Sequence, residues 1–198
     1  MLSAIISTHE SERLLVPTLA ALVPGATSGV LTDVIVADGN SSDETEKVAD
    51  IAGCKFVSSD APAGTRLREA ARQAKSPWLM FLRAGTVPDP GWIAALERFI
   101  EDADHHGTTA VRAATFRRAP AGGIGRSAFA EATAALRDMV RRAHRPDQGL
   151  VIHRRFYDQL GGHPDSGDAE TLLMRRLGGR RIAMLGATVT QRALPADT

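Results

Sequence analysis

Four short apolar runs alternate with helical patterns over the first half of the chain. The runs span residues 2–7, 34–37, 55–57 and 78–82. Each is long enough for a buried strand and too short for a helix, whereas Leu15, Leu19 and Leu22 keep the spacing of an amphipathic helix. Because the connections are short, this alternation predicts an α/β fold in which helices flank a doubly wound, mainly parallel sheet.

The second half of the chain is less regular. Strands are expected at residues 109–116, 149–153 and 182–185, and helices at 126–145, 154–160 and 169–177. The Pro24-Gly25 pair is expected to end the first helix. Asp89, followed by Pro90, is expected to begin the helix after the fourth run. With 198 residues and no linker-like break or internal repeat, the chain is expected to form one domain.

The composition excludes several classes of protein. The formal net charge of +1 argues against a dedicated nucleic-acid binder, which usually carries a large excess of basic residues. The single cysteine, Cys54, excludes an internal disulfide framework and fits a reducing compartment. No run approaches the roughly 18 apolar residues of a membrane span, and the first residues lack a signal-peptide pattern. These features predict a soluble, cytoplasmic protein.

The second apolar run ends abruptly in Asp38, a glycine and a polar cluster. In a parallel sheet this places the carboxylate at the carboxyl end of a strand, beside the crevice in which open α/β sheets bind ligands. Ser41 and Glu44 have the spacing of a capping box, and a helix N-terminus favours anions such as phosphate. The alternative is a solvated turn between strand and helix with good capping residues.

Two enzyme classes built on related folds lack their motifs here. No G-x-G-x-x-G follows the first run, which disfavours a dinucleotide-dependent oxidoreductase. No G-x-S-x-G occurs in the chain, so a hydrolase with a nucleophile elbow is unsupported.

Five motifs, in order along the chain, make the pattern specific. They are IISTHE at residues 5–10, VADGNSSD at 36–43, FLRAGT at 81–86, DQGLVIHRR at 147–155 and LGGHP at 160–164. Together they resemble a family 2 glycosyltransferase with the GT-A fold, most closely a small bacterial subgroup. The resemblance implies one GT-A-like domain over residues 1–198, with a nucleotide-binding half at 1–108 and an acceptor or sugar half at 109–198.

The resemblance also implies a site for a nucleotide-diphosphate sugar. Asp38 corresponds to the carboxylate that hydrogen-bonds the nucleoside, while Thr8 and Glu10 stand where the family's first loop contacts the nucleotide. Glu10 departs from the usual Asn, or is offset by one residue from the family's acid. Arg66 fits a basic position beside the diphosphate.

The chain departs from the family at Arg83-Ala84-Gly85. The family has an acidic Asp-x-Asp or His-Ala-Asp motif here, which helps to hold a divalent cation on the diphosphate. A glycine side chain supplies no oxygen and an arginine repels Mg²⁺ or Mn²⁺, so the sequence assigns no metal ligand. Binding of Mg²⁺ or Mn²⁺ through other groups stays an alternative. Arg83 either replaces the metal on the phosphates, marks a site that has lost catalysis, or simply ends the strand in solvent.

The resemblance places the catalytic base late in the chain. Glu170 falls where the family's base stands, with Asp168 two residues away, and the two are not in the usual adjacent form. Alternatively, Asp168 caps a helix and Glu170 is a first-turn acid. Asp147 and Gln148 correspond to sugar or acceptor contacts, or to a polar loop before a strand. His163 replaces a typical aromatic residue and is expected to be packed rather than to bind a ligand.

The leading hypothesis is therefore transfer of a sugar, with inversion, from a nucleotide-diphosphate donor to an unidentified acceptor. The alternative is an inactive glycosyltransferase-like protein that binds a nucleotide or nucleotide sugar. The arginine-rich end of the helix expected at 126–145 leaves contact with a membrane surface open, although solvated arginines are favoured. A homodimer through an exposed apolar helix face also stays open.

Overall fold

The computed structural model describes residues 1–119 and 145–192 and shows an α/β fold. Its strands are β1 (Leu2–Thr8), β2 (Leu31–Asp38), β3 (Lys55–Ser58), β4 (Trp78–Arg83), β5 (Thr86–Pro88), β6 (Ala113–Arg118), β7 (Leu150–His153) and β8 (Ile182–Gln191). Its helices are α1 (Glu12–Thr27), α2 (Thr45–Ile51), α3 (Ala63–Gln73), α4 (Trp92–His105), α6 (Arg154–Gln159) and α7 (Ala169–Leu177), with 3₁₀ turns η1 (Pro146–Gln148) and η2 (Gly179–Arg181). The helix expected at 126–145 lies outside the described residues except for its last position.

The strands form one sheet in the order β3-β2-β1-β4-β7-β6-β8-β5. The first four of these strands are parallel, as the alternation in the sequence predicts. Beyond β4 the sheet is mixed, because β7 is antiparallel to β4 and β6, whereas β6 and β8 are parallel. The predicted doubly wound, mainly parallel sheet is confirmed.

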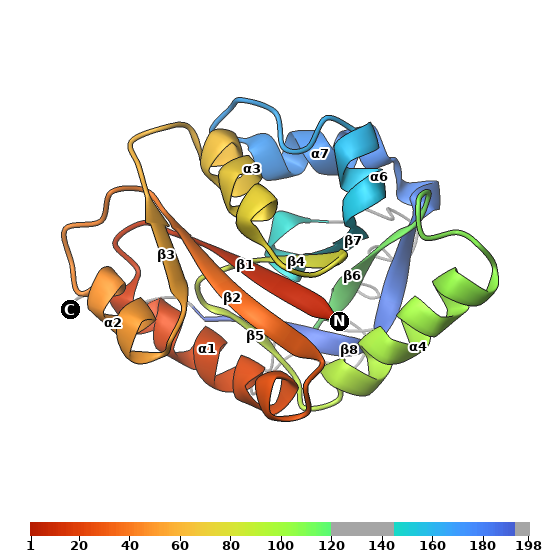
Figure 1. Cartoon of the computed structure of the whole chain (residues 1–198), viewed down its shortest axis with the longest axis horizontal. Helices are drawn as coiled ribbons and strands as arrows, with labels where there is room; N and C mark the ends of the chain where they lie inside the picture. The colour runs from red at the N-terminus through yellow and green to blue at the C-terminus, as the bar shows by residue number, and fades with distance from the viewer. Residues whose placement is uncertain (120–144, 193–198) are drawn as a thin grey trace, which may run out of the picture.

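Helices cover both faces of the sheet (Figure 1). On one face, α1, α2 and α4 pack over a core that includes Leu19, Leu22, Met80 and Leu96. On the other face, α3, α6 and α7 pack over a second core. Burial on both faces explains why the parallel strands read as continuous apolar runs rather than as alternating patterns.

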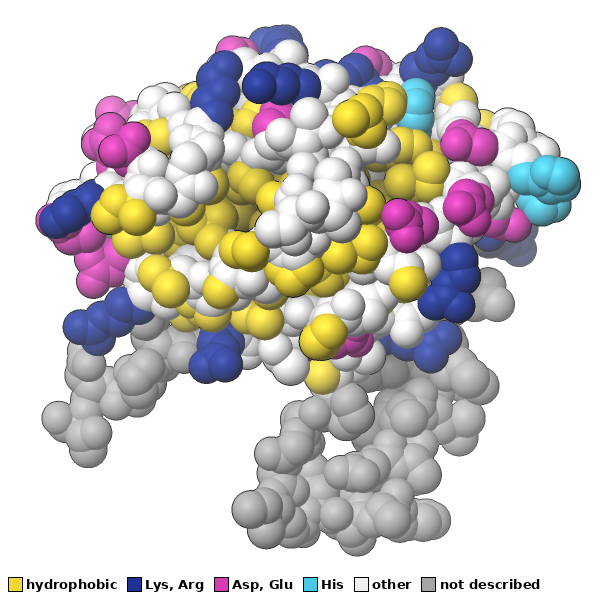
Figure 2. Space-filling model, turned by 60° about the horizontal axis from the view of Figure 1, so that its bottom comes forward, with side chains coloured by type: hydrophobic (Ala, Val, Ile, Leu, Met, Phe, Trp, Pro, Cys, Tyr) yellow, Lys and Arg dark blue, Asp and Glu magenta, His cyan; other side chains and the backbone are white. Residues whose placement is uncertain are grey.

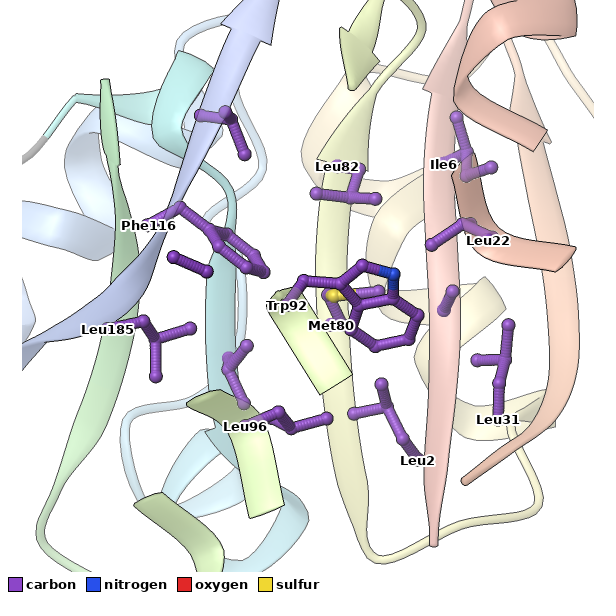
Figure 3. Packing of buried hydrophobic residues seen from close by; sticks show 14 of the residues in the cluster. Leu2, Ile6, Leu22, Leu31, Met80, Leu82, Trp92, Leu96, Phe116 and Leu185 are labelled. Carbon is purple, nitrogen blue, oxygen red and sulfur yellow. The ribbon is translucent and has the colours of Figure 1, made fainter. Parts of the chain in front are cut away.

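The first core is centred on Trp92 of α4 (Figure 3). Its indole N–H donates to the carbonyl oxygen of Ala21 in α1 at 3.1 Å, so the ring joins the two helices. Gly25 makes room for this ring, because a Cβ at that position would lie 2.5 Å from two of its carbon atoms.

This packing corrects one predicted boundary. Helix α1 does not end at Pro24-Gly25 but continues to Thr27, and Gly29 follows it with φ +76°. Gly25 is therefore required by a close contact inside the helix rather than by a turn. The structure also places the start of α4 at Trp92, after an N-cap at Gly91, instead of at Asp89 and Pro90.

Three other segments differ in extent from the prediction. β5 is not among the expected strands, β6 begins at Ala113 rather than at residue 109, and β8 extends to Gln191 rather than ending at residue 185. The extension of β8 arises because its end pairs with β5, a contact between segments about a hundred residues apart.

The outer side of α1 is apolar as well as its inner side. Val16 and Val23 are about half exposed, and Figure 2 shows hydrophobic side chains gathered on this side of the molecule. This is the kind of helix face for which the sequence leaves a homodimer open. None of the helices in the part of the chain that the structure describes is long and apolar enough to span a membrane.

Candidate functional site

The fold brings four polar positions to one edge of the sheet. Thr8, Asp38 and Ser58 end β1, β2 and β3 in register, and Arg83 ends β4 opposite Ser7. Strand β7 runs the other way, so η1 and its Asp147 enter at the same edge just before β7 begins. The candidate site therefore has two parts, one around Asp38 and one around Arg83, with β1 between their strands.

Asp38 is fully buried at the centre of the first part. Its Oδ1 accepts hydrogen bonds from the hydroxyls of Thr8 (2.7 Å) and Ser41 (2.6 Å), and its Oδ2 accepts from the backbone N–H of Ser41 (2.7 Å) and the hydroxyl of Ser58 (3.1 Å). Burial raises the pKa of Asp38, but the bonds from Ser41, Thr8 and Ser58 together outweigh it and lower this pKa. Asp38 is thus an ionised carboxylate that organises the wall of the crevice.

The four lone-pair positions of this carboxylate are all used within the protein. A direct bond from Asp38 to a nucleoside, which the family resemblance predicts, would have to replace one of them. The bond from Ser58 is the longest and comes from the most exposed of the three donor residues, so it is the one that a ligand could replace at least cost.

Glu10 fastens the loop after β1 to the loop after β2. Its carboxylate accepts from the backbone N–H of Ser42 at 2.7 Å, and its own N–H donates to the Ser41 hydroxyl at 2.8 Å. Glu10 and Asn40 both have positive φ, +48° and +60°, which non-glycine residues rarely adopt. Such backbone conformations cluster at functional sites, where the surrounding bonds over-determine them.

The predicted capping box between Ser41 and Glu44 is wrong. Ser41 donates its hydroxyl to the buried Asp38 carboxylate, a charged acceptor that makes a stronger bond than a cap would. Helix α2 has Glu44 at its N-cap, without a capping bond from that side chain. Asp43, one residue earlier, lies against this terminus, since its Oδ1 accepts from the backbone N–H of Thr45 at 3.0 Å. A carboxylate therefore already lies at the helix N-terminus for which the sequence predicts a bound anion such as phosphate.

Arg66 lies against the same loop. A Cβ at Gly39 would be 3.0 Å from Arg66 Nη2 and 3.2 Å from His9 Nδ1, so the glycine after Asp38 lets both side chains approach the backbone. Arg66 Nη1 donates to the carbonyl oxygen of Ala61 at 2.6 Å. Its Nε is buried and has no hydrogen-bond partner among the described residues.

Arg83 and Glu170 form an ion pair in the second part of the site. Arg83 Nε donates to Glu170 Oε2 at 2.5 Å, and Nη2 contacts the same oxygen. The Arg83 side chain is 44% exposed and that of Glu170 is 15% exposed. Arg83 does not simply end its strand in solvent, because this pair joins the end of β4 to the first turn of α7.

The surroundings of Glu170 perturb its proton affinity. Burial raises the pKa of Glu170, the hydrogen bond and charge of Arg83 lower it, and the charges of Asp168 and Asp147 raise it again, with a net result above the usual value. Glu170 also lines a small cavity, whose other walls are Phe81, Pro146, Leu150, His163 and Met174. A carboxylate with a raised pKa in such a place is a candidate acid or base.

Asp168 is exposed and immediately precedes α7, in the N-cap position, but its side chain makes no capping hydrogen bond. Asp147 pairs with Arg118 at 3.3 Å, while its Oδ1 is buried and has no hydrogen-bond partner in the described chain. Both aspartates act on Glu170 through their charges rather than through direct bonds.

Gln148 supports the fold at this point. Its amide Nε2 donates to the carbonyl oxygen of Phe116 at 2.9 Å, and its Oε1 accepts from the backbone N–H of Arg145 at 2.7 Å. With 6% of its surface exposed and both ends of its amide engaged, Gln148 holds η1 against β6 and offers little to a sugar or acceptor.

The segment after Arg83 does not fit a bound metal ion. Gly85, which stands where the family has an acid, has φ +89°, and a Cβ there would lie 2.8 Å from the carbonyl oxygen of Arg192. A carboxylate side chain would thus be strained at this position. Within residues 1–119 and 145–192, no group of three or more His, Cys, Asp or Glu side chains could hold a metal ion.

Several residues of the site are not evident from the sequence. Ser58 has a local signal, because it directly follows the third apolar run. Arg118 has none, because it lies in a strand whose neighbours in the sheet are distant in sequence. His163 is packed as expected: it is 1% exposed, and its Nδ1 is 2.8 Å from the hydroxyl oxygen of Tyr157. Burial lowers the pKa of His163 to about 3, so the ring is neutral.

Solved structures show the same architecture. Residues 1–349 of TarS from S. aureus superpose with a TM-score of 0.72 at 15% identity, covering 96% of this chain and 60% of that one. Glucosyl-3-phosphoglycerate synthase (GpgS) from Mycobacterium tuberculosis, in complex with Mn²⁺, UDP and glucosyl-3-phosphoglycerate, gives a TM-score of 0.67 at 19% identity, covering 98% and 73%. The chain therefore spans about three fifths of the TarS fragment.

The family follows from the sequence. No curated protein sequence matches the chain significantly. The sequence model of glycosyl transferase family 2 matches residues 3–122, which is more than half of the chain and includes both loops around Asp38 and the end of β4. The chain belongs to glycosyl transferase family 2 and has the GT-A fold.

Proposed function

We propose that this chain transfers a sugar from a nucleotide-diphosphate donor to an acceptor hydroxyl, with inversion at the anomeric carbon and with Arg83 in place of a metal cation. The observation that carries the proposal is the pair of Arg83 and Glu170 at the carboxyl end of β4. It puts a cation suited to a diphosphate beside a carboxylate suited to an acceptor. UDP is the first nucleotide to test, because TarS and GpgS were both solved with it.

In the proposed step, the acceptor oxygen forms a bond to the anomeric carbon as the bond from that carbon to the diphosphate breaks. Glu170 takes the acceptor's proton, which its raised pKa favours, since the best base has a pKa near the working pH. The nucleoside diphosphate leaves with the bonding electrons, and Arg83 offsets the negative charge that develops on it. Asp168, two residues away, is the alternative base.

The rest of the donor site follows from the first part of the edge. We assign Thr8, Glu10 and Asp38 to the nucleoside side, with Asp38 acting mainly by holding the loops in place. Arg66, whose buried Nε makes no hydrogen bond to the described residues, is assigned to the diphosphate. Asp147 is assigned to the sugar or the acceptor, because it lies on the η1 turn beside the Arg83–Glu170 pair.

The test is release of UDP from UDP-glucose and UDP-N-acetylglucosamine, measured in EDTA with a panel of hydroxyl acceptors. We expect turnover that depends on an acceptor and falls at least about 100-fold in Glu170→Gln, since general base catalysis contributes about 10²–10⁴-fold. Asp168→Asn, tested in parallel, assigns the base. Turnover that requires Mn²⁺ would contradict the role given to Arg83.

The alternative, an inactive nucleotide-sugar-binding protein, is favoured by one observation: position 85 holds a glycine in a conformation, φ +89°, that would strain the acid expected there from the family. It predicts that UDP or a UDP-sugar binds to the wild-type protein while no acceptor in the panel produces turnover. In that case Glu170→Gln would leave the basal release of UDP unchanged.

A further inference from the structure

Glu170 and its partner lie in a site with an excess of negative charge. The carboxylates of Glu170, Asp168 and Asp147 all act on the guanidinium of Arg83 through their charges. Arg118 offsets part of this charge through its pair with Asp147. Two arginines against three carboxylates leave the group with one net negative charge.

A diphosphate entering this group meets a specific obstacle. Its negative charges are attracted to Arg83 but repelled by the carboxylate that already contacts that guanidinium. The contact is close, with Nε and Nη2 of Arg83 both on Oε2 of Glu170. Because Glu170 is mostly buried, solvent screens this repulsion less than it would at an open surface.

We propose that Arg83 is a shared cation for which Glu170 and the diphosphate of the donor compete, so that donor binding breaks the ion pair and releases Glu170 to the acceptor. This inference rests on the proposed function and adds an order of events to it. Before the donor arrives, Arg83 holds Glu170 and makes it a weaker base. After the donor arrives, the guanidinium is on the phosphates, and Glu170 keeps only the influences that raise its proton affinity.

The two partners differ in how freely they can move. Arg83 is at the end of a strand and is nearly half exposed, so its long side chain can turn toward a ligand in the crevice. Glu170 lies in the first turn of α7, whose neighbouring Ala169 and Leu173 are buried. The arginine is therefore the partner that moves, and the carboxylate stays beside its cavity.

The experiment is a double-mutant cycle on UDP affinity, measured by calorimetry in EDTA. Glu170→Gln keeps the shape of the side chain and removes its charge, so UDP should bind roughly three- to tenfold more tightly, as expected from the modest strength of a partly exposed ion pair. In the Arg83→Ala background the same substitution should tighten binding by a smaller factor, because only the direct repulsion between the carboxylate and the diphosphate is then relieved. Competition for Arg83 predicts this dependence on background.

Asp168→Asn is the matched control, because it removes a nearby negative charge that makes no hydrogen bond to Arg83. It should change UDP affinity less than Glu170→Gln does, and by the same factor in both backgrounds. If Glu170→Gln fails to fold, as judged by circular dichroism, Glu170→Asp keeps the charge but shortens the reach by one methylene, and it should also tighten binding.

The outcomes separate the two proposals. If UDP binds and Glu170→Gln strengthens binding equally with and without Arg83, or does not strengthen it, the competition is overturned while the donor site stands. If UDP, GDP and their sugars all fail to bind the wild-type protein, the proposed function fails and this inference falls with it.

Discussion

Removal of the Asp38 carboxylate is the substitution whose effect follows most directly from the structure. In Asp38→Ala, the backbone N–H of Ser41 loses a bond of 2.7 Å, and the hydroxyl of Thr8, a residue only 4% exposed, loses another of 2.7 Å. The hydroxyls of the half-buried Ser41 and the exposed Ser58 also lose their bonds, but they can turn to water at little cost. Each buried group left without its partner costs about 1–3 kcal/mol, so we expect a loss of about 2–6 kcal/mol in the free energy of unfolding.

Asp38→Asn should cost less than Asp38→Ala, because an amide keeps one oxygen acceptor. If the amide oxygen faces the backbone N–H of Ser41, that hydrogen bond is kept. The amide nitrogen then faces Thr8, whose hydroxyl can rotate to accept a bond from it. We therefore expect the free energy of unfolding to decrease in the order wild type, Asp38→Asn, Asp38→Ala, and this order tests the hydrogen bonds of the carboxylate. Asp60→Ala, an exposed acid in a nearby loop, is the control and should change stability by less than about 0.5 kcal/mol.

The effect should also depend on pH. The pKa of Asp38 is lower in the folded protein than its usual value of about 3.9, so its bonds stabilise the fold above that pH and this stabilisation is lost as the pH falls further. Urea unfolding is followed by circular dichroism from pH 7 towards pH 3. The difference in the free energy of unfolding between wild type and Asp38→Ala should become smaller as the pH falls. A gap that is absent at pH 7, or that stays constant to pH 3, would refute the reasoning.

Other substitutions test separate parts of the account. Gly85→Asp should lower the free energy of unfolding in urea by about 1–3 kcal/mol without creating a Mn²⁺ site detectable by calorimetry, because its φ is +89° and Arg192 blocks the Cβ. Gly25→Ala should cost about 1–3 kcal/mol and shift tryptophan fluorescence, since the new methyl group would meet the Trp92 ring; unchanged stability and emission would contradict this packing. Burial raises the pKa of Cys54 to about 11, so Ellman's reagent should label the native protein far more slowly than a free thiol; labelling at the free-thiol rate would refute this.

The parallel half of the fold could be predicted from the sequence because each of its strands is a continuous apolar run bounded by polar turns. The helix pattern around Leu19 is equally clear in the sequence, but the end of α1 is not. Gly25 is needed because the Trp92 ring packs against it, and not because the helix ends there. The strand β5 has only three residues and pairs with the far end of β8, so no local pattern could reveal it.

The site was predictable to a different degree in its two parts. The motif around Asp38 is contiguous, so the loop that follows this residue could be predicted. The bond from Ser41 to the carboxylate could not, because the sequence pattern favours Ser41 as a helix cap. The family resemblance points to Arg83 and Glu170 separately, to Arg83 as a departure from the metal motif and to Glu170 as the base. Their pairing, across 87 residues, depends on how α7 packs against the end of β4, which spacing in the sequence does not encode.

The most direct test of the central claim is a calorimetric titration with UDP in the presence of Mn²⁺ and, separately, of EDTA. If Arg83 stands in for the metal, UDP should bind equally well in both, and Arg83→Ala should weaken binding about tenfold or more. Arg118→Ala, which removes a similarly exposed arginine paired with Asp147, should weaken it less. Binding that requires Mn²⁺, or that is indifferent to Arg83→Ala, would contradict the account.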